Sequence, residues 1–289
     1  MTVPNESANL AGKSIVITGG ARGIGLSIAL SCRAAGAHVT VMARSQTDLV
    51  EAQRMLAQVS GNGRSLALQG DVSSDADLFR VYTAANEAFG DIYGLICAAG
   101  IYGVMRSFTS CEFADWEKTI SINLLGAARS IHAALPMMKE GRIILFSGGG
   151  QGPMVNFSDY VASKGAIWRL TETLGAELAP RKIYVNAVAP GAVNTRLLDD
   201  LLAAGPEQIG EDLYKKSIQQ QASGGQGSQK ASELCLYLLS DRSAGLYGKT
   251  LSAVWDQYQN LQNFSEISPS DLFCYRRVVD LKGGTREAK

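Results

Sequence analysis

Three polar residues in the middle of the chain have the types and spacing needed for proton transfer. Tyr160 and Lys164 stand four residues apart, and Ser147 precedes Tyr160 by thirteen residues. Four residues advance a helix by about one turn, so the phenol and the ammonium project from one face, roughly 6 Å apart along the axis. A nearby ammonium favours the phenolate and lowers the pKa of a tyrosine from its usual value of about 10. A serine hydroxyl brought alongside would hold a carbonyl oxygen while the tyrosine passes it a proton.

A glycine-rich turn near the N-terminus strengthens this interpretation, because the tyrosine–lysine pair alone also arises by chance on exposed helix faces. Residues 14–18 are a short apolar run, and a helical pattern resumes at Leu26. Glycine permits close approach to a phosphate, and a helix start presents free N–H groups to an anion. Strand, turn and helix in this order predict a pyrophosphate site, with an ordinary structural turn as the alternative. The glycines are Gly19, Gly23 and Gly25.

Apolar strand-like runs alternate with helical patterns along most of the chain. This alternation predicts an α/β fold with a parallel sheet of about seven strands and helices on both faces. The expected strands are residues 14–18, 38–42, 65–69, 93–97, 142–146, 182–188 and 249–254. In a doubly wound sheet ligands bind at the carboxyl ends of the strands, so we expect the site at that edge.

Composition and charge exclude several classes of protein. The chain has 27 basic and 27 acidic residues, whereas a nucleic-acid or anionic-membrane partner needs a basic excess, so we expect neither. The sequence has no apolar run long enough for a membrane span and no signal-peptide pattern at its start, which predicts a cytoplasmic protein. Two histidines and five cysteines without C-x-x-C pairing predict no metal site. Ser147 lacks the glycine two positions earlier that a hydrolase nucleophile elbow uses.

Seven short motifs resemble, in order and spacing, the short-chain dehydrogenase/reductase family over roughly residues 10–256. They are Thr18-Gly19-x-x-x-Gly23-x-Gly25, Asp71-Val72, Ala99-Gly100, Asn123, Ser147, Tyr160-x-x-x-Lys164 and Pro190-Gly191-x-x-x-Thr195. The resemblance implies one Rossmann-type domain over residues 1–256, a nicotinamide cofactor, and oxidation or reduction of an alcohol/carbonyl pair.

The resemblance also implies roles for single residues. Tyr160 is the acid/base, Ser147 polarises the substrate oxygen, and Lys164 binds the nicotinamide ribose and lowers the tyrosine pKa. Asn123 kinks a helix and holds a water linked to Lys164; otherwise it would be a solvent group on a helix face. The residues that the resemblance implies for contact with the cofactor are Gly19, Gly23, Ile24, Gly25, Asp71, Val72, Ala99, Gly100, Tyr160, Lys164, Pro190, Gly191, Val193 and Thr195.

Two of these assignments have an alternative explanation. The resemblance implies that Asp71, backed by Val72, accepts a hydrogen bond from the adenine amino group. The alternative is that Asp71 is simply an acidic residue at the start of a helix, where the helix dipole favours it. Thr195 is implied to contact the nicotinamide carboxamide, and it would also cap a helix that begins at Arg196.

The residues after the second strand favour NADP over NAD. Ala43 stands where a carboxylate would bind the ribose hydroxyls of NAD, Arg44 follows it, and Arg22 lies in the glycine turn. Two guanidinium groups would hold a 2′-phosphate through charge-assisted hydrogen bonds, with Ser45 adding a donor. In the family, basic residues here usually accompany NADP. The alternative is that both arginines are solvated surface charges.

Two motifs depart from the family pattern. Residues 97–100 read Cys-Ala-Ala-Gly where many relatives have Asn-Asn-Ala-Gly, and we expect a packing consequence. Residues 146–150 read Phe-Ser-Gly-Gly-Gly where many relatives have two serines and often use the second. Counting back from Tyr160 selects Ser147, whereas counting forward from Gly141 selects Gly148. We assign Ser147 because it is the only hydroxyl available there.

Two further segments are expected near the substrate. Residues 196–227, with leucine pairs and a Gly-Pro step, are typical of a lid, or their leucines are the buried face of an amphipathic helix. Residues 257–289 extend beyond the usual family end and contain apolar side chains, so we expect them to pack on the pocket or on a neighbouring subunit. The resemblance implies a homodimer or homotetramer.

These features together predict a cytoplasmic NADPH-dependent carbonyl reductase that also works as an alcohol dehydrogenase on a small-molecule substrate. Tyr102 and Met105 are expected to shape the substrate pocket. NAD-dependent alcohol oxidation on the same fold is the nearest alternative. A non-catalytic NADP-binding sensor is the alternative of another class, and the intact set of catalytic residues argues against it. That set is Asn123, Ser147, Tyr160 and Lys164.

Overall fold

The computed structural model describes residues 8–148, 153–223 and 228–274. Its centre is a sheet of seven strands in the order β3-β2-β1-β4-β5-β6-β7, all paired in parallel. The strands are β1 (Ser14–Thr18), β2 (His38–Ala43), β3 (Ser65–Gln69), β4 (Ile92–Cys97), β5 (Gly141–Phe146), β6 (Ile183–Ala189) and β7 (Thr250–Ser252). The predicted doubly wound α/β fold is therefore confirmed. β7 is shorter than predicted, because the chain turns after Ser252, whose N–H donates to the Asp256 carboxylate at 2.7 Å.

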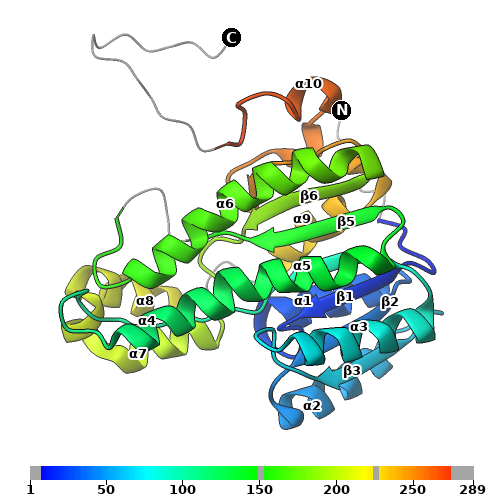
Figure 1. Ribbon diagram of the computed structural model, residues 1–289. Coiled ribbons are helices and arrows are strands. Elements are labelled where there is room, and N and C mark those ends of the chain that lie inside the picture. The colour runs from blue at the N-terminus through cyan, green and yellow to red at the C-terminus, as the bar shows by residue number, and fades with distance from the viewer. Residues whose placement is uncertain (1–7, 149–152, 224–227, 275–289) are drawn as a thin grey trace, which may run out of the picture.

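Helices cover both faces of the sheet (Figure 1). The helices are α1 (Gly23–Ala34), α2 (Gln46–Gln58), α3 (Asp75–Phe89), α4 (Phe113–Ile120), α5 (Gly126–Ala134), α6 (Ser158–Leu178), α7 (Arg196–Ile209), α8 (Glu211–Ala222), α9 (Gln229–Leu239) and α10 (Phe264–Ile267). Because side chains alternate along a strand, Ile15 and Ile17 of β1 enter one core, with α1, α2 and α9. Val16 enters the other, with α3, α5 and α6.

A third apolar cluster lies beyond the sheet, where α7 and α8 meet the start of α6. Phe157, Leu198, Leu201 and Ile209 are its buried members. Leu198, Leu201 and Leu202 thus pack in this cluster, as expected for the buried face of an amphipathic helix, whereas Leu197 does not belong to it. Gly205, at φ 74°, breaks the helical geometry before Pro206. The assignment of residues 196–227 as a lid stays a prediction, and residues 224–227 lie outside the described residues.

The described part of the C-terminal extension packs against α9 and β7 of its own chain. Tyr258 is buried with its ring centroid 5.2 Å from that of Tyr237, and the carbonyl of Phe273 accepts from the N–H of Thr250 at 3.1 Å. A short helix, α10, adds Phe264 to the same core. Contact of the extension with the pocket or a neighbouring subunit stays a prediction, and residues 275–289 lie outside the described residues.

Candidate active site

A cavity of about 980 Å³ lies at the carboxyl edge of the sheet. Its walls come from the turns after β1, β2, β3 and β4, together with the start of α7. Most of the predicted cofactor residues line it: Gly19, Arg22, Gly23, Ile24, Gly25, Arg44, Ser45, Asp71, Val72, Ala99, Gly100 and Thr195. The parallel sheet brings these residues together because all of its strands end at this edge.

The glycine turn needs two of its glycines for geometric reasons. Gly19 has φ 68°, and a Cβ there would lie 2.7 Å from the backbone nitrogen of Ala99. A Cβ on Gly25 would overlap the carbonyl oxygen of Gly19. The backbone is therefore open at the N-terminus of α1, where free N–H groups and the helix dipole favour an anion. These features fit a pyrophosphate, as the sequence predicted.

Two arginines line this cavity, one in the glycine turn after β1 and one after β2, and an acidic residue in the first turn of α2 lies beside the first of them. Arg22 forms an ion pair with Asp48 at 3.5 Å. Ser45 is the N-cap of α2, and its hydroxyl oxygen accepts from the N–H of Asp48 at 3.2 Å, which leaves the hydroxyl proton free to donate. Sequence reasoning missed Asp48; the signal available was an acid in the first turn of a helix that begins at the cofactor edge.

The other predicted cofactor residues lie nearby. The carboxylate of Asp71 accepts from the N–H and the hydroxyl of Ser73, at 2.9 and 2.7 Å, so a second oxygen remains for a ligand. Thr195 occupies the N-cap position of α7, but its hydroxyl makes no capping hydrogen bond, and its methyl lies 3.3 Å from where a Gly23 Cβ would be. Pro190, Gly191 and Val193 follow β6 at the same edge but outside the lining of this cavity.

Lys164 is held firmly beside Tyr160 on α6. Its Nζ lies 5.7 Å from the centroid of the Tyr160 ring and donates to the carbonyl of Phe146 at 2.9 Å. Burial lowers the pKa of Lys164 to about 8, because the charged form loses its hydration. The predicted arrangement of phenol and ammonium on one helix face is thus present.

The pKa of Tyr160 differs from the expectation that Lys164 lowers it. Burial raises the pKa of Tyr160 well above its usual value, and the neighbouring Tyr102 phenol adds to the shift. Desolvation of the phenolate dominates, and the ammonium is directed to a backbone carbonyl instead. A tyrosine in this state keeps its proton at neutral pH.

Asn123 lies in a π-helical turn, Ser121–Leu125, between α4 and α5. Its side chain accepts from the N–H of Ile101 and donates to the carbonyl of Ile101, both at 2.9 Å, and it donates to the Ser163 hydroxyl at 3.1 Å. Asn123 is buried, so it is not a solvent group on a helix face. It joins the loop after β4 to α6, and its predicted role in a water relay stays a prediction.

The loop after β4 brings a second phenol to the site. The Tyr102 ring lies 4.8 Å from that of Tyr160 and 5.8 Å from that of Phe157, measured between centroids. Met105, Met154, Leu202 and Tyr214 pack against the same apolar cluster. Tyr102 and Met105 are therefore near the site, as the sequence predicted, whereas the position of Phe157 was missed because it precedes the helix with no distinguishing motif.

Ser147 and Gly148 follow β5 and take different directions. The N–H of Ser147 extends the sheet by donating to the Val188 carbonyl at 3.0 Å, and its hydroxyl is buried without a hydrogen-bond partner among the described residues. A Cβ on Gly148 would instead lie 2.8 Å from the hydroxyl of Tyr160. The assignment of Ser147 as the oxygen-polarising residue stays a prediction; Gly149 and Gly150 lie outside the described residues.

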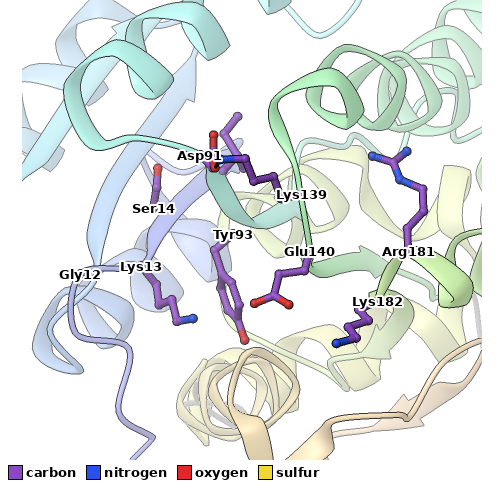
Figure 2. A pocket seen from close by; sticks show the side chains of 10 residues that line it. Gly12, Lys13, Ser14, Asp91, Tyr93, Lys139, Glu140, Arg181 and Lys182 are labelled. Carbon is purple, nitrogen blue, oxygen red and sulfur yellow. Dashed lines mark ion pairs between the residues drawn. The ribbon is translucent and has the colours of Figure 1, made fainter.

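A second hollow, of about 480 Å³, lies at the opposite edge of the sheet (Figure 2). It is lined by residues that precede or begin β1, β4, β5 and β6, among them Lys13, Asp91, Glu140 and Lys182. The Asp91 carboxylate pairs with Lys139 at 2.6 Å. No predicted site residue lines this hollow, because the loops that carry chemistry in a doubly wound sheet leave from the carboxyl ends.

The open glycine turn, the sheet order and the tyrosine–lysine pair together define a dinucleotide-binding oxidoreductase fold. The family described as "short chain dehydrogenase" matches residues 13–204. The chain belongs to this family, and it is an NAD(P)-dependent oxidoreductase that acts on CH–OH groups. The predicted family, fold and enzyme class are confirmed.

Individual relatives cover most of the chain. Mouse 3-ketodihydrosphingosine reductase is 32% identical, over 82% of this chain and 76% of its own length. The solved structure of levodione reductase has a TM-score of 0.76 at 27% identity and covers 84% of this chain and 96% of its own. Carveol dehydrogenase from Mycobacterium avium, in complex with NAD, has a TM-score of 0.75 at 25% identity and covers 85% and 97%. Within the residues described, no helix has the length and apolar character to cross a membrane.

Proposed function

We propose that the protein is an NADPH-dependent carbonyl reductase that also catalyses the reverse alcohol oxidation. One observation carries this proposal: Tyr160 and the buried ammonium of Lys164 stand together next to Gly100, which lines the same cavity as Arg22 and Arg44. The tyrosine–lysine pair supplies proton transfer, and the two guanidinium groups favour the phosphorylated ribose.

The described residues fit NADPH at three points. The backbone around Gly19 and Gly25 leaves room for a pyrophosphate, and Arg22, Arg44 and Ser45 would hold the 2′-phosphate. Thr195 and Lys164 would hold the nicotinamide end. When bound, the nicotinamide supplies the hydride.

Residues of the chain itself supply the proton that the carbonyl oxygen needs. Tyr160 keeps its proton because burial raises its pKa, so it is ready to protonate a carbonyl oxygen during reduction. Asn123 fixes the loop after β4 through both backbone groups of Ile101, which positions the wall of the site. Reduction needs this protonation state, because Tyr160 must then donate a proton.

The surroundings of Tyr160 favour a lipophilic substrate. Tyr160 packs in the same apolar cluster as Tyr102, Met105, Met154, Phe157 and Leu202. Apolar walls with few polar groups bind apolar ligands and orient them through those groups. The relatives named for ketosphinganine, levodione and carveol support a bulky lipophilic ketone as the substrate class.

Substitution of Tyr160 by phenylalanine tests the proposal. We expect the variant to bind NADPH as the native protein does and to lose nearly all ketone reduction, because only the transferable proton is removed. The measurement pairs an NADPH fluorescence titration with turnover on a panel of lipophilic ketones. Undiminished turnover in the variant, or binding of NADPH with no turnover by the native protein, would reject the reductase and favour the non-catalytic sensor.

We further propose a homodimer or homotetramer in the cytoplasm. Exposed aromatic side chains on and before α4, those of Phe108 and Phe113, support self-association. The balanced charge of the chain supports the absence of a nucleic-acid partner. Light scattering on the purified protein measures the assembly, and a monomer at micromolar concentration contradicts it.

A further inference from the structure

The residue that faces the hydroxyl of Tyr160 from the end of β5 is a glycine. A Cβ on Gly148 would lie 2.8 Å from Tyr160 Oη, closer than real Cβ contacts come. The tyrosine hydroxyl therefore occupies the space that a side chain at position 148 would need. No serine can stand there without displacing Tyr160.

The neighbouring serine does not take over this position. Ser147 Oγ is buried and has no hydrogen-bond partner in the described ranges, so it is not bonded to Tyr160. Adjacent residues of an extended chain point to opposite sides, and Ser147 continues the sheet through its N–H to Val188. The Tyr160 hydroxyl thus receives no hydrogen bond from Ser147.

A second phenol lies beside Tyr160 and is a candidate hydrogen-bond donor. Tyr102 lies against Tyr160 with a tilt of 59° between the rings, and its hydroxyl makes no hydrogen bond to another described residue. Burial raises the pKa of Tyr102, so it remains a proton donor at neutral pH.

The backbone that carries Tyr102 is fixed on both sides. Asn123 bonds both the N–H and the carbonyl of Ile101 at 2.9 Å. The buried carboxylate of Asp159 accepts from the N–H of Val104 at 2.8 Å. Asp159 directly precedes Tyr160 on α6, so the same helix positions both phenols. Such preorganisation is what a hydrogen-bond donor needs to stabilise developing charge.

We propose that Tyr102 donates the second hydrogen bond to the substrate carbonyl oxygen, in place of a serine, while Tyr160 transfers its proton. This inference rests on the proposed reductase function. During reduction the carbonyl carbon would accept a hydride from NADPH, which becomes NADP+, while the carbonyl oxygen takes the Tyr160 proton. This leaves a phenolate on Tyr160, which regains a proton from solvent after the reaction. Tyr102 keeps its own proton throughout, so NADPH is the only co-reactant. The site then suits a ketone whose oxygen reaches both phenol hydroxyls.

The test compares Tyr102→Phe with Ser147→Ala. Phenylalanine keeps the ring contacts with Tyr160 and Phe157 and removes only the hydroxyl. We expect kcat for a lipophilic ketone to fall about 100-fold in Tyr102→Phe, as when an oxyanion donor is removed, and to change less than about twofold in Ser147→Ala. NADPH affinity should be unchanged in both variants. Circular dichroism and Tm of each variant establish that it is folded.

A second readout does not depend on turnover. A ketone labelled with ¹³C at the carbonyl is bound together with oxidised cofactor, and its carbonyl stretch is recorded by difference infrared spectroscopy. We expect the stretch to shift to higher frequency in Tyr102→Phe and to stay unchanged in Ser147→Ala, because only the first loses a hydrogen bond.

The outcomes separate this inference from the function on which it rests. Loss of activity in Ser147→Ala with native activity in Tyr102→Phe overturns the inference and assigns the second hydrogen bond to Ser147. Native activity in both variants also overturns it and leaves the reductase intact. A native protein that binds NADPH and reduces no ketone overturns both.

Discussion

Substitutions at the arginines test the preference for NADPH most directly, because they act on one phosphate. Arg44 lines the cavity, and its guanidinium has no ion-pair partner among the described residues, whereas Arg22 pairs with Asp48 at 3.5 Å. A charge-assisted hydrogen bond contributes about 1.5–3 kcal/mol, and exposure of Arg44 reduces this to about 1.4 kcal/mol. Arg44→Ala should therefore weaken NADPH binding about tenfold. NADH lacks the phosphate, so its affinity should change less than about twofold.

Substitution of Asp48 should change NADPH affinity in the opposite direction. Its carboxylate lines the same cavity and is 32% exposed, so it repels a 2′-phosphate placed near Arg22. A unit charge about 4 Å away in water contributes about 1 kcal/mol. Asp48→Asn removes this repulsion and releases Arg22, so NADPH should bind about fivefold more tightly. NADH binding should again stay nearly constant.

The assay is a titration of the purified protein with NADPH and with NADH, followed by nicotinamide fluorescence. Arg54→Ala is the matched control, because Arg54 lies on α2, pairs with Glu51 at 2.6 Å and does not line the cavity. Tighter binding of NADH than NADPH by the native protein would refute the reasoning and favour NAD-dependent oxidation. Equal NADPH affinities for Arg44→Ala and Arg54→Ala would show that Arg44 is a solvated surface charge.

Three further predictions concern the catalytic helix and the extension. Gly148→Ala should lower kcat at least about tenfold with NADPH affinity unchanged, because its Cβ displaces the Tyr160 hydroxyl; native kinetics would contradict the contact at 2.8 Å. Lys164 is charged below its pKa of about 8, so NADPH affinity should fall as the pH rises through about 8 and stay flat in Lys164→Met; a flat native profile up to about pH 10 refutes this role. Truncation after Asp256 removes the buried Tyr258 and should destabilise the fold by at least about 2 kcal/mol, which lowers Tm by about 5 °C or more. An unchanged melting curve would show that the extension does not stabilise the domain.

The sequence by itself determined the fold, and it predicted candidate site residues most of which the structure places at one edge of the sheet. Apolar runs and the glycine turn predicted all seven strands to within two residues at each end, because strand formation depends on local patterns of side chains. The four-residue spacing of Tyr160 and Lys164 placed both on one face of α6 for the same reason. Because all the strands of a parallel sheet end at one edge, residues that follow different strands, such as Arg44 and Asp71, line one cavity.

Tertiary structure decided the features that depend on distant neighbours. Counting residues could not choose between Ser147 and Gly148, because the direction of each is set by how the end of β5 meets α6. The pKa of Tyr160 depends on the total burial of the phenol, which a helix pattern does not contain. The contact of Tyr102 with Tyr160 joins residues 58 positions apart through loops fixed by Asn123. Short-range patterns specify elements, whereas packing between elements specifies which atoms meet.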